Sequence, residues 1–75
     1  MSSNRPRPCR AALARRRAQV ARQVQTLRAR TYEPANEYEY DHARAWLYCL
    51  DWVLGGSQGD EEGFDAWVAR LANET

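Results

Sequence analysis

The chain has 75 residues and a net charge of +1, which comes from eleven arginines and ten acidic residues without a single lysine. A chain of this length forms one small domain that buries only about 60% of its unfolded surface, so a deep active-site cleft between two lobes is hard to build. It has no run of about 18 apolar residues and no apolar segment behind its first residues, so we expect neither a membrane span nor a secretory signal, and a cytoplasmic location.

The charges are segregated along the chain. Residues 1–30 hold nine arginines and no acidic residue, whereas residues 31–75 hold all ten acidic residues and two arginines, which gives formal charges of +9 and −8. Such asymmetry is typical of proteins that contact nucleic acid or carry a charged tail. Arginine suits such contacts because its planar guanidinium pairs bidentately with phosphates and carboxylates.

Residues 1–8 are predicted to form an extended basic tail, because Pro6 and Pro8 bias the residues before them away from helix. The rest, residues 9–75, is predicted to be a single helical domain with helices over about 9–31, 37–54 and 60–73. The predicted fold is therefore all-α: a small three-helix domain, or a long helical hairpin with a short third helix.

The first predicted helix is amphipathic, and the apolar residues that share one side at helical spacing are Leu13, Val20, Val24 and Leu27. Rotating about 100° per residue sorts its arginines into three groups. The inward group is Arg10, Arg17 and Arg28, the outward group is Arg15 and Arg22, and between them lie Arg16 and Arg30. We expect the inward group to meet acidic residues of the later helices.

The second predicted helix follows a turn over residues 31–36. Asn36 and Glu39 have the spacing of a capping box, and Gly55 and Gly56 supply a stop. Its later turns, AWLYCLDWVL, are apolar on almost every side. Because such a helix is normally packed on more than one side, we expect it to be the central helix or to be half-covered by another molecule.

The third predicted helix follows the loop GGSQGD, with Ser57 or Asp60 as its cap. Its apolar residues recur at i, i+3, i+4 and i+7, which is the spacing of one buried stripe. These residues are Phe64, Trp67, Val68 and Leu71.

No catalytic, metal or cofactor site is predicted. His42 and Cys49 are seven residues apart, about 10 Å along a helix, which is too far for a nucleophile and its base. With Cys9 they are the only histidine and cysteines of the chain, too few and too scattered for a structural zinc site. Cys49 is predicted to be a small buried hydrophobe. We therefore expect neither an enzyme nor a small-molecule substrate, and no motif is specific enough to name a family.

All eight aromatic residues lie in the acidic half of the chain. The simplest prediction places Trp46, Trp52, Phe64 and Trp67 in the core. One helix cannot hide Trp46, Tyr48, Trp52 and Leu54 on the same side, however, so part of the second helix should be a contact surface. Tyrosine and tryptophan dominate protein-binding hot spots. The candidate protein-binding residues are Tyr38, Tyr40, Trp46, Tyr48, Asp51 and Trp52.

The arginines admit three interpretations: they contact phosphates, they pair with acidic residues of this chain or of a second copy, or they form a solvated face. The candidates for phosphate or acidic-partner contacts are Arg5, Arg7, Arg15, Arg16, Arg22 and Arg30.

These observations favour a non-catalytic interaction protein that binds another protein or itself, as a regulator, an inhibitor or an assembly subunit. A phage-encoded inhibitor of a host complex is one version of this hypothesis. The rival hypothesis is a nucleic-acid-binding accessory protein that uses the arginine helix, whose affinity would fall steeply with salt. A third is self-assembly through head-to-tail charge pairing.

Overall fold

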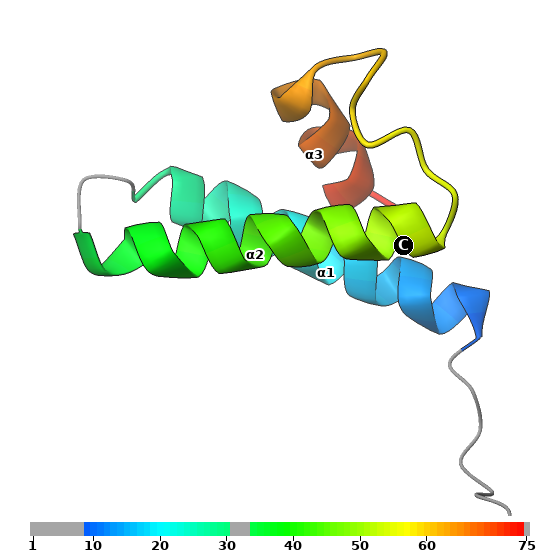
Figure 1. Ribbon diagram of the computed structural model, residues 1–75, viewed down its shortest axis with the longest axis horizontal. Coiled ribbons are helices and arrows are strands. Elements are labelled where there is room, and N and C mark those ends of the chain that lie inside the picture. The colour runs from blue at the N-terminus through cyan, green and yellow to red at the C-terminus, as the bar shows by residue number, and fades with distance from the viewer. Residues whose placement is uncertain (1–8, 31–33, 75) are drawn as a thin grey trace, which may run out of the picture.

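The computed structural model describes residues 9–30 and 34–74, which form three helices and no strand (Figure 1). Helix α1 spans Arg10–Arg28, α2 spans Pro34–Val53 and α3 spans Phe64–Ala72. Helices α1 and α2 lie side by side and antiparallel, and α3 packs across α1. The predicted all-α fold is confirmed. The predicted tail, residues 1–8 with Arg5 and Arg7, lies outside the described residues.

Helix α1 is the helix on which both others pack, so of the two alternatives for the second helix the first, that it is the central helix, is wrong. The predicted stripes of the first and third helices are confirmed, with Leu13 and Phe64 only partly buried at the edge of the core. Alanine at position 21 of α1 is fully buried, and such a small side chain lets the neighbouring helices approach closely. The buried cluster comprises Val20, Ala21, Val24, Leu27, Ala43, Leu47, Leu50, Trp67, Val68, Leu71 and Ala72.

Helix α2 begins at Pro34, three residues earlier than predicted, so the capping box of Asn36 and Glu39 is wrong. The fixed φ of proline and its missing N–H suit the first turn of a helix, which explains the earlier start. Asn36 therefore lies inside the first turn, where its Nδ2 donates to the carbonyl of Arg30 at 3.2 Å and ties α2 to the end of α1.

The predicted glycine stop of α2 is confirmed. Gly55 has a φ of 74°, its N–H donates to the Trp52 carbonyl at 3.0 Å, and the Gly56 N–H donates to the Asp51 carbonyl at 2.8 Å. This is a Schellman motif, in which a residue of left-handed conformation satisfies the last carbonyls of the helix.

Helix α3 begins at Phe64 after an N-cap at Gly63, so the predicted start at residue 60 and the caps Ser57 or Asp60 are wrong. The chain turns at Gly59, which has a φ of 81° and lies so close to the Trp67 ring that an added Cβ would stand 3.4 Å from it. Gly63 also has a positive φ, 82°, and a helix cannot run through a residue in this conformation, so α3 starts at Phe64 and not at residue 60.

A single buried carboxylate joins the parts of the domain. Asp51 on α2 is only 1% exposed, and Arg17 on α1 donates to its Oδ1 at 2.7 Å. The backbone N–H of Gln58 donates to its Oδ2 at 2.8 Å. Arg17 also donates to Glu74, beyond α3, at 2.8 Å. Arg17 therefore meets an acidic residue of the second helix, as predicted for the inward group.

We predict that Asp51→Ala lowers the free energy of unfolding by about 2–4 kcal/mol, because it leaves the partly buried Arg17 with Glu74 alone and the Gln58 N–H without its acceptor. Urea denaturation followed by circular dichroism measures the change. The matched control is Asp41→Ala, whose surface pair with Arg44 spans 3.8 Å, and which should shift stability by no more than about 0.5 kcal/mol. Equal effects of the two substitutions would show that the buried pair does not hold the domain together.

Candidate protein-binding surface

Helix α2 has apolar residues on two opposite sides. Its inner seam, Ala43, Leu47 and Leu50, is buried against the rest of the core. On the other side Tyr38 is 79% exposed, Trp52 is 74% exposed and Trp46 is 50% exposed. The prediction that Trp46 and Trp52 belong to the core is therefore wrong.

The exposed side forms one continuous face. Its residues recur at i, i+4, i+7, i+8, i+11, i+14 and i+15, so they share one side of the helix, and none is arginine, aspartate or glutamate. The rings of Tyr38 and His42 stack with centroids 6.4 Å apart. We call this set the outer face of α2, and it comprises Tyr38, His42, Ala45, Trp46, Cys49, Trp52 and Val53.

The outer face contains a shallow hollow of about 200 Å³, which is lined by His42, Ala45, Trp46 and Cys49. Cys49 is exposed, so the prediction that it is a buried hydrophobe is wrong. Its position, four residues after Ala45, points it away from the inner seam. Since an aromatic side chain has about 150–250 Å² of surface, the exposed parts of the three aromatics add up to roughly 400 Å². Apolar patches of several hundred Å² mark interaction sites on soluble proteins.

The other predicted protein-binding residues contribute to the fold instead. Asp51 is buried, so its predicted place on an exposed contact surface is wrong. Tyr48 is half-buried and its ring stacks on Trp67 at 5.0 Å. Tyr40 packs against the core, with the Arg44 guanidinium 5.8 Å above its ring. Of the six candidates, the outer face therefore gathers Tyr38, Trp46 and Trp52.

Four residues of the outer face were missed from the sequence. His42 and Cys49 were weighed as a catalytic pair and as metal ligands, and Cys49 also as a buried hydrophobe, whereas Ala45 and Val53 were not considered. The signal that could have found them is their spacing, since with Tyr38 and Trp52 they recur at intervals of three and four residues.

The inward arginines bind groups of their own chain. Arg28 pairs with Asp65 of α3, and its guanidinium lies 5.3 Å from the Phe64 ring. Arg10 donates to the carbonyl of Leu54 at 2.8 Å, at the end of α2 where the helix dipole favours a positive charge. The predicted meeting with acidic residues is thus confirmed for Arg17 and Arg28, whereas Arg10 meets a carbonyl instead.

The arginines predicted to contact phosphates differ in what they bind in the structure. Arg22, predicted to point outward, donates to the Ala72 carbonyl at 2.8 Å, because the end of α3 packs on that side of α1. Arg15 and Arg16 are exposed, and Arg16 donates to Gln19 on its own helix at 3.3 Å. Arg30 is also exposed. All four described candidates, Arg22 included, are thus exposed, but Arg22 is held against the end of α3 by its bond to Ala72.

Near the end of the chain, Arg70 lies between two acidic residues. It donates to Glu62 at 2.7 Å and to Glu74 at 3.2 Å. The hydrogen bonds that Arg70 donates to Glu62 raise the pKa of the Arg70 guanidinium, and the charges of Glu62 and Glu74 add to this effect. Glu74 also binds Arg17, so it connects this surface cluster to the buried pair.

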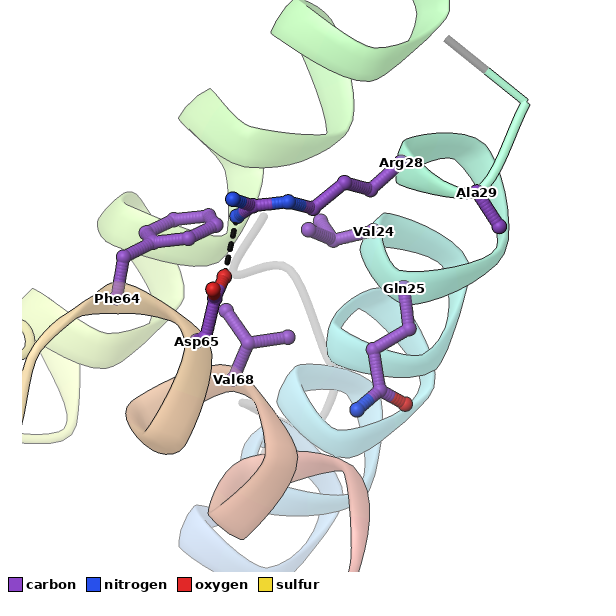
Figure 2. A pocket seen from close by; sticks show the side chains of 7 residues that line it. All are labelled: Val24, Gln25, Arg28, Ala29, Phe64, Asp65 and Val68. Carbon is purple, nitrogen blue, oxygen red and sulfur yellow. Dashed lines mark ion pairs between the residues drawn. The ribbon is translucent and has the colours of Figure 1, made fainter.

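A second hollow of about 370 Å³ lies between α1 and α3 (Figure 2). Val24 and Val68 form its apolar floor. Arg28 reaches across from α1 to Asp65 of α3 beside the Phe64 ring, so the charges in this groove already neutralise each other. The groove therefore offers apolar surface beside a paired charge, and Phe64 is the one aromatic residue of its lining, against three on the outer face.

The chain gives no significant match to protein-family models, to curated proteins or to solved structures. Within residues 9–30 and 34–74, no helix is long and apolar enough to cross a membrane. The same residues contain no group of three or more His, Cys, Asp or Glu side chains placed to hold a metal ion.

We predict that the exposed tryptophans contribute little to folding. Trp46→Ala and Trp52→Ala should each change the free energy of unfolding by less than about 1 kcal/mol. Trp67→Ala, the matched substitution at a fully buried position, should cost about 3–5 kcal/mol. Urea denaturation at the lowest protein concentration that gives a signal measures all three. A loss for Trp52→Ala as large as that for Trp67→Ala would mean that α2 is packed on both sides within one chain.

Proposed function

We propose that this protein is a non-catalytic interaction protein that binds another protein through the outer face of α2. The observation that supports this proposal is the exposure of Tyr38, Trp46 and Trp52 on one uncharged face, while the inner seam of the same helix is already buried in the core. Aromatic side chains are enriched at the centres of protein interfaces, and charged residues are depleted there.

The size of the aromatic patch fits this role. Burial of roughly 400 Å² of apolar surface contributes on the order of 10 kcal/mol at about 25 cal/mol per Å². Association costs about 4–15 kcal/mol in lost freedom of motion, so this burial is of the right order to offset it. The outer face would thus supply the central contact of an interface, and surrounding polar residues would adjust its affinity.

The contacts of the arginines favour protein binding over the rival function, nucleic-acid binding. Arg10, Arg17, Arg22 and Arg28 already bind carbonyls or carboxylates of their own chain. An arginine occupied in this way is less available to a phosphate, and affinity for nucleic acid rises with the number of phosphates neutralised. The arginine-based function would therefore rest on Arg15, Arg16 and Arg30 and on the tail.

The same surface also indicates how the protein would act on a bound partner. The outer face consists mainly of aromatic and small side chains that offer contact area, so the protein would act by occupying a partner's surface or by joining partners together. Regulator, inhibitor and assembly subunit are the roles that such a contact supports.

The experiment compares two double variants as baits in extract from the native source, and then with the purified captured protein. We expect Trp46→Ala with Trp52→Ala to weaken binding at least tenfold, because buried aromatic hot spots each contribute about 2 kcal/mol or more. The matched control, Arg15→Glu with Arg16→Glu on the exposed side of α1, should bind like the wild type. Isothermal titration calorimetry measures both affinities.

Binding to generic duplex DNA and RNA at low and raised salt tests the rival function. Tight binding that falls steeply with salt and is lost in Arg15→Glu with Arg16→Glu, but kept in Trp46→Ala with Trp52→Ala, would overturn the proposal. A captured partner that binds both double variants equally would also overturn it.

A further inference from the structure

We infer that the outer face of α2 binds the same face of a second copy of this chain, in an antiparallel dimer with two-fold symmetry. The inference rests on the proposed function and deepens it by naming the partner.

The first observation is the spacing of the outer face. Its central line is Tyr38, His42, Ala45, Cys49 and Trp52, which recur at intervals of four, three, four and three residues. This alternation keeps a line of side chains facing a neighbouring helix. The inner seam of α2 has intervals of four and three as well, and it packs against α1. Helix α2 therefore carries two helix-packing lines on opposite sides, and among residues 9–30 and 34–74 only the inner line is covered.

The second observation is the symmetry of this line about Ala45. Tyr38 lies seven residues before Ala45 and Trp52 lies seven residues after it, about 10 Å away in each direction. If two copies pack antiparallel with the two-fold axis at the level of Ala45, Tyr38 of each copy faces Trp52 of the other. The smallest residue of the line then lies where the helices come closest, and the aromatic rings pair on either side.

The axis also brings together the two copies of Trp46. Each lies one residue from Ala45 on the same side of the line, so the two indoles meet across the interface. An interface with paired aromatics at its centre has the composition expected of hot spots.

The third observation is the charge around the face, which selects the antiparallel orientation. Glu37, Glu39 and Asp41 are exposed in the first turns of α2, and the outer face itself carries no arginine or acidic residue. A parallel pair would place these acidic turns beside their own copies. In the antiparallel pair the two copies of Glu39 lie about 18 Å apart along the helices, beyond a Debye length at physiological salt.

The fourth observation is the surface area that two copies could bury against each other. The exposed aromatics of two copies supply roughly 800 Å², and His42, Cys49 and Val53 add to this. The sum approaches about 1,200 Å², the lower end of the range for specific interfaces. We therefore expect a concentration-dependent dimer. A two-fold interface uses the same patch on both copies and closes on itself, whereas head-to-tail charge pairing would propagate into longer assemblies.

Disulfide cross-linking tests the arrangement. The Ala45→Cys variant in a Cys9→Ser, Cys49→Ser background should form an intermolecular disulfide under mild oxidation, because the dimer brings the two Cα atoms at position 45 within the range of about 4.4–6.8 Å that a disulfide needs. The matched control is Cys9→Ser alone, which keeps Cys49. In the antiparallel dimer the two copies of Cys49 are about 12 Å apart along the helices and should not link.

Sedimentation equilibrium of the wild type supplies a second readout that does not depend on the cysteine variants. We expect a dimer whose dissociation constant changes little with salt and rises at least tenfold in Trp52→Glu. The same substitution should prevent cross-linking of the Ala45→Cys variant, and Arg16→Glu should leave both readouts unchanged.

Three results would overturn the inference. They are a monomer at every concentration, a disulfide through Cys49 in place of the one at position 45, and salt-sensitive assembly that Trp52→Glu leaves intact. The bait experiment separates this failure from that of the proposed function. A different protein that binds the wild type and is lost in Trp46→Ala with Trp52→Ala would keep the proposed function and reject the second copy as partner.

Discussion

The ion pair between Arg17 and Asp51 determines how the helices are placed. The Asp51 carboxylate accepts from α1 and from the loop after α2, and Arg17 carries the connection on to Glu74. Gly56 is part of the same arrangement, because a Cβ there would collide with the carboxylate. Breaking a buried pair is costly, while forming one contributes little net stability. The pair therefore acts mainly by making one rotation of α2 about its axis far better than the others.

This rotation explains why tryptophan faces solvent while alanine is buried. A turn of α2 by one residue, about 100°, would bring Trp52 towards α1 and carry Asp51 away from Arg17. Burying more of Trp52 would contribute about 1.5–3 kcal/mol, as for other large apolar side chains. Separating the pair would leave a buried charge without its partner, at about 3–5 kcal/mol, and would also move Leu47 and Leu50 out of the core. The polar contact outweighs the aromatic one, so α2 keeps its larger apolar side chains on the outside.

The sequence was sufficient to predict the parts of the fold that depend on residues close to one another in the chain. Rotation by 100° per residue placed Arg17 among the apolar residues of its helix, and the pair of glycines marked the end of α2. Helical periodicity could not decide which apolar side of α2 meets α1, because that choice depends on a partner 34 residues away in the chain. The prediction that Cys49 is buried failed for the same reason, because Cys49 lies on the side of α2 that faces away from α1. The start of α3 escaped prediction because Gly63 adopts a φ of 82°, which a helix cannot run through, and the sequence does not reveal the φ of a glycine.

The arginines and the aromatic residues each have a structural role that differs from the one their abundance in the sequence suggests. A strongly basic first helix is typical of nucleic-acid binding, yet four of its arginines bind acceptors on α2, on α3 or in the segments that follow them. An aromatic-rich second half is typical of a core, yet of the aromatic residues that the structure describes only Trp67 is fully buried, and the two other tryptophans lie on the outer face. The long side chain of arginine donates directional hydrogen bonds to carbonyls and carboxylates of other helices. These bonds help to hold the helices together in a domain that has few large aliphatic side chains. The aromatic surface that this arrangement leaves uncovered is then free to meet another molecule. Specificity for that molecule would come from the spacing of the outer face and from the acidic turns beside it, rather than from the arginines that dominate the sequence.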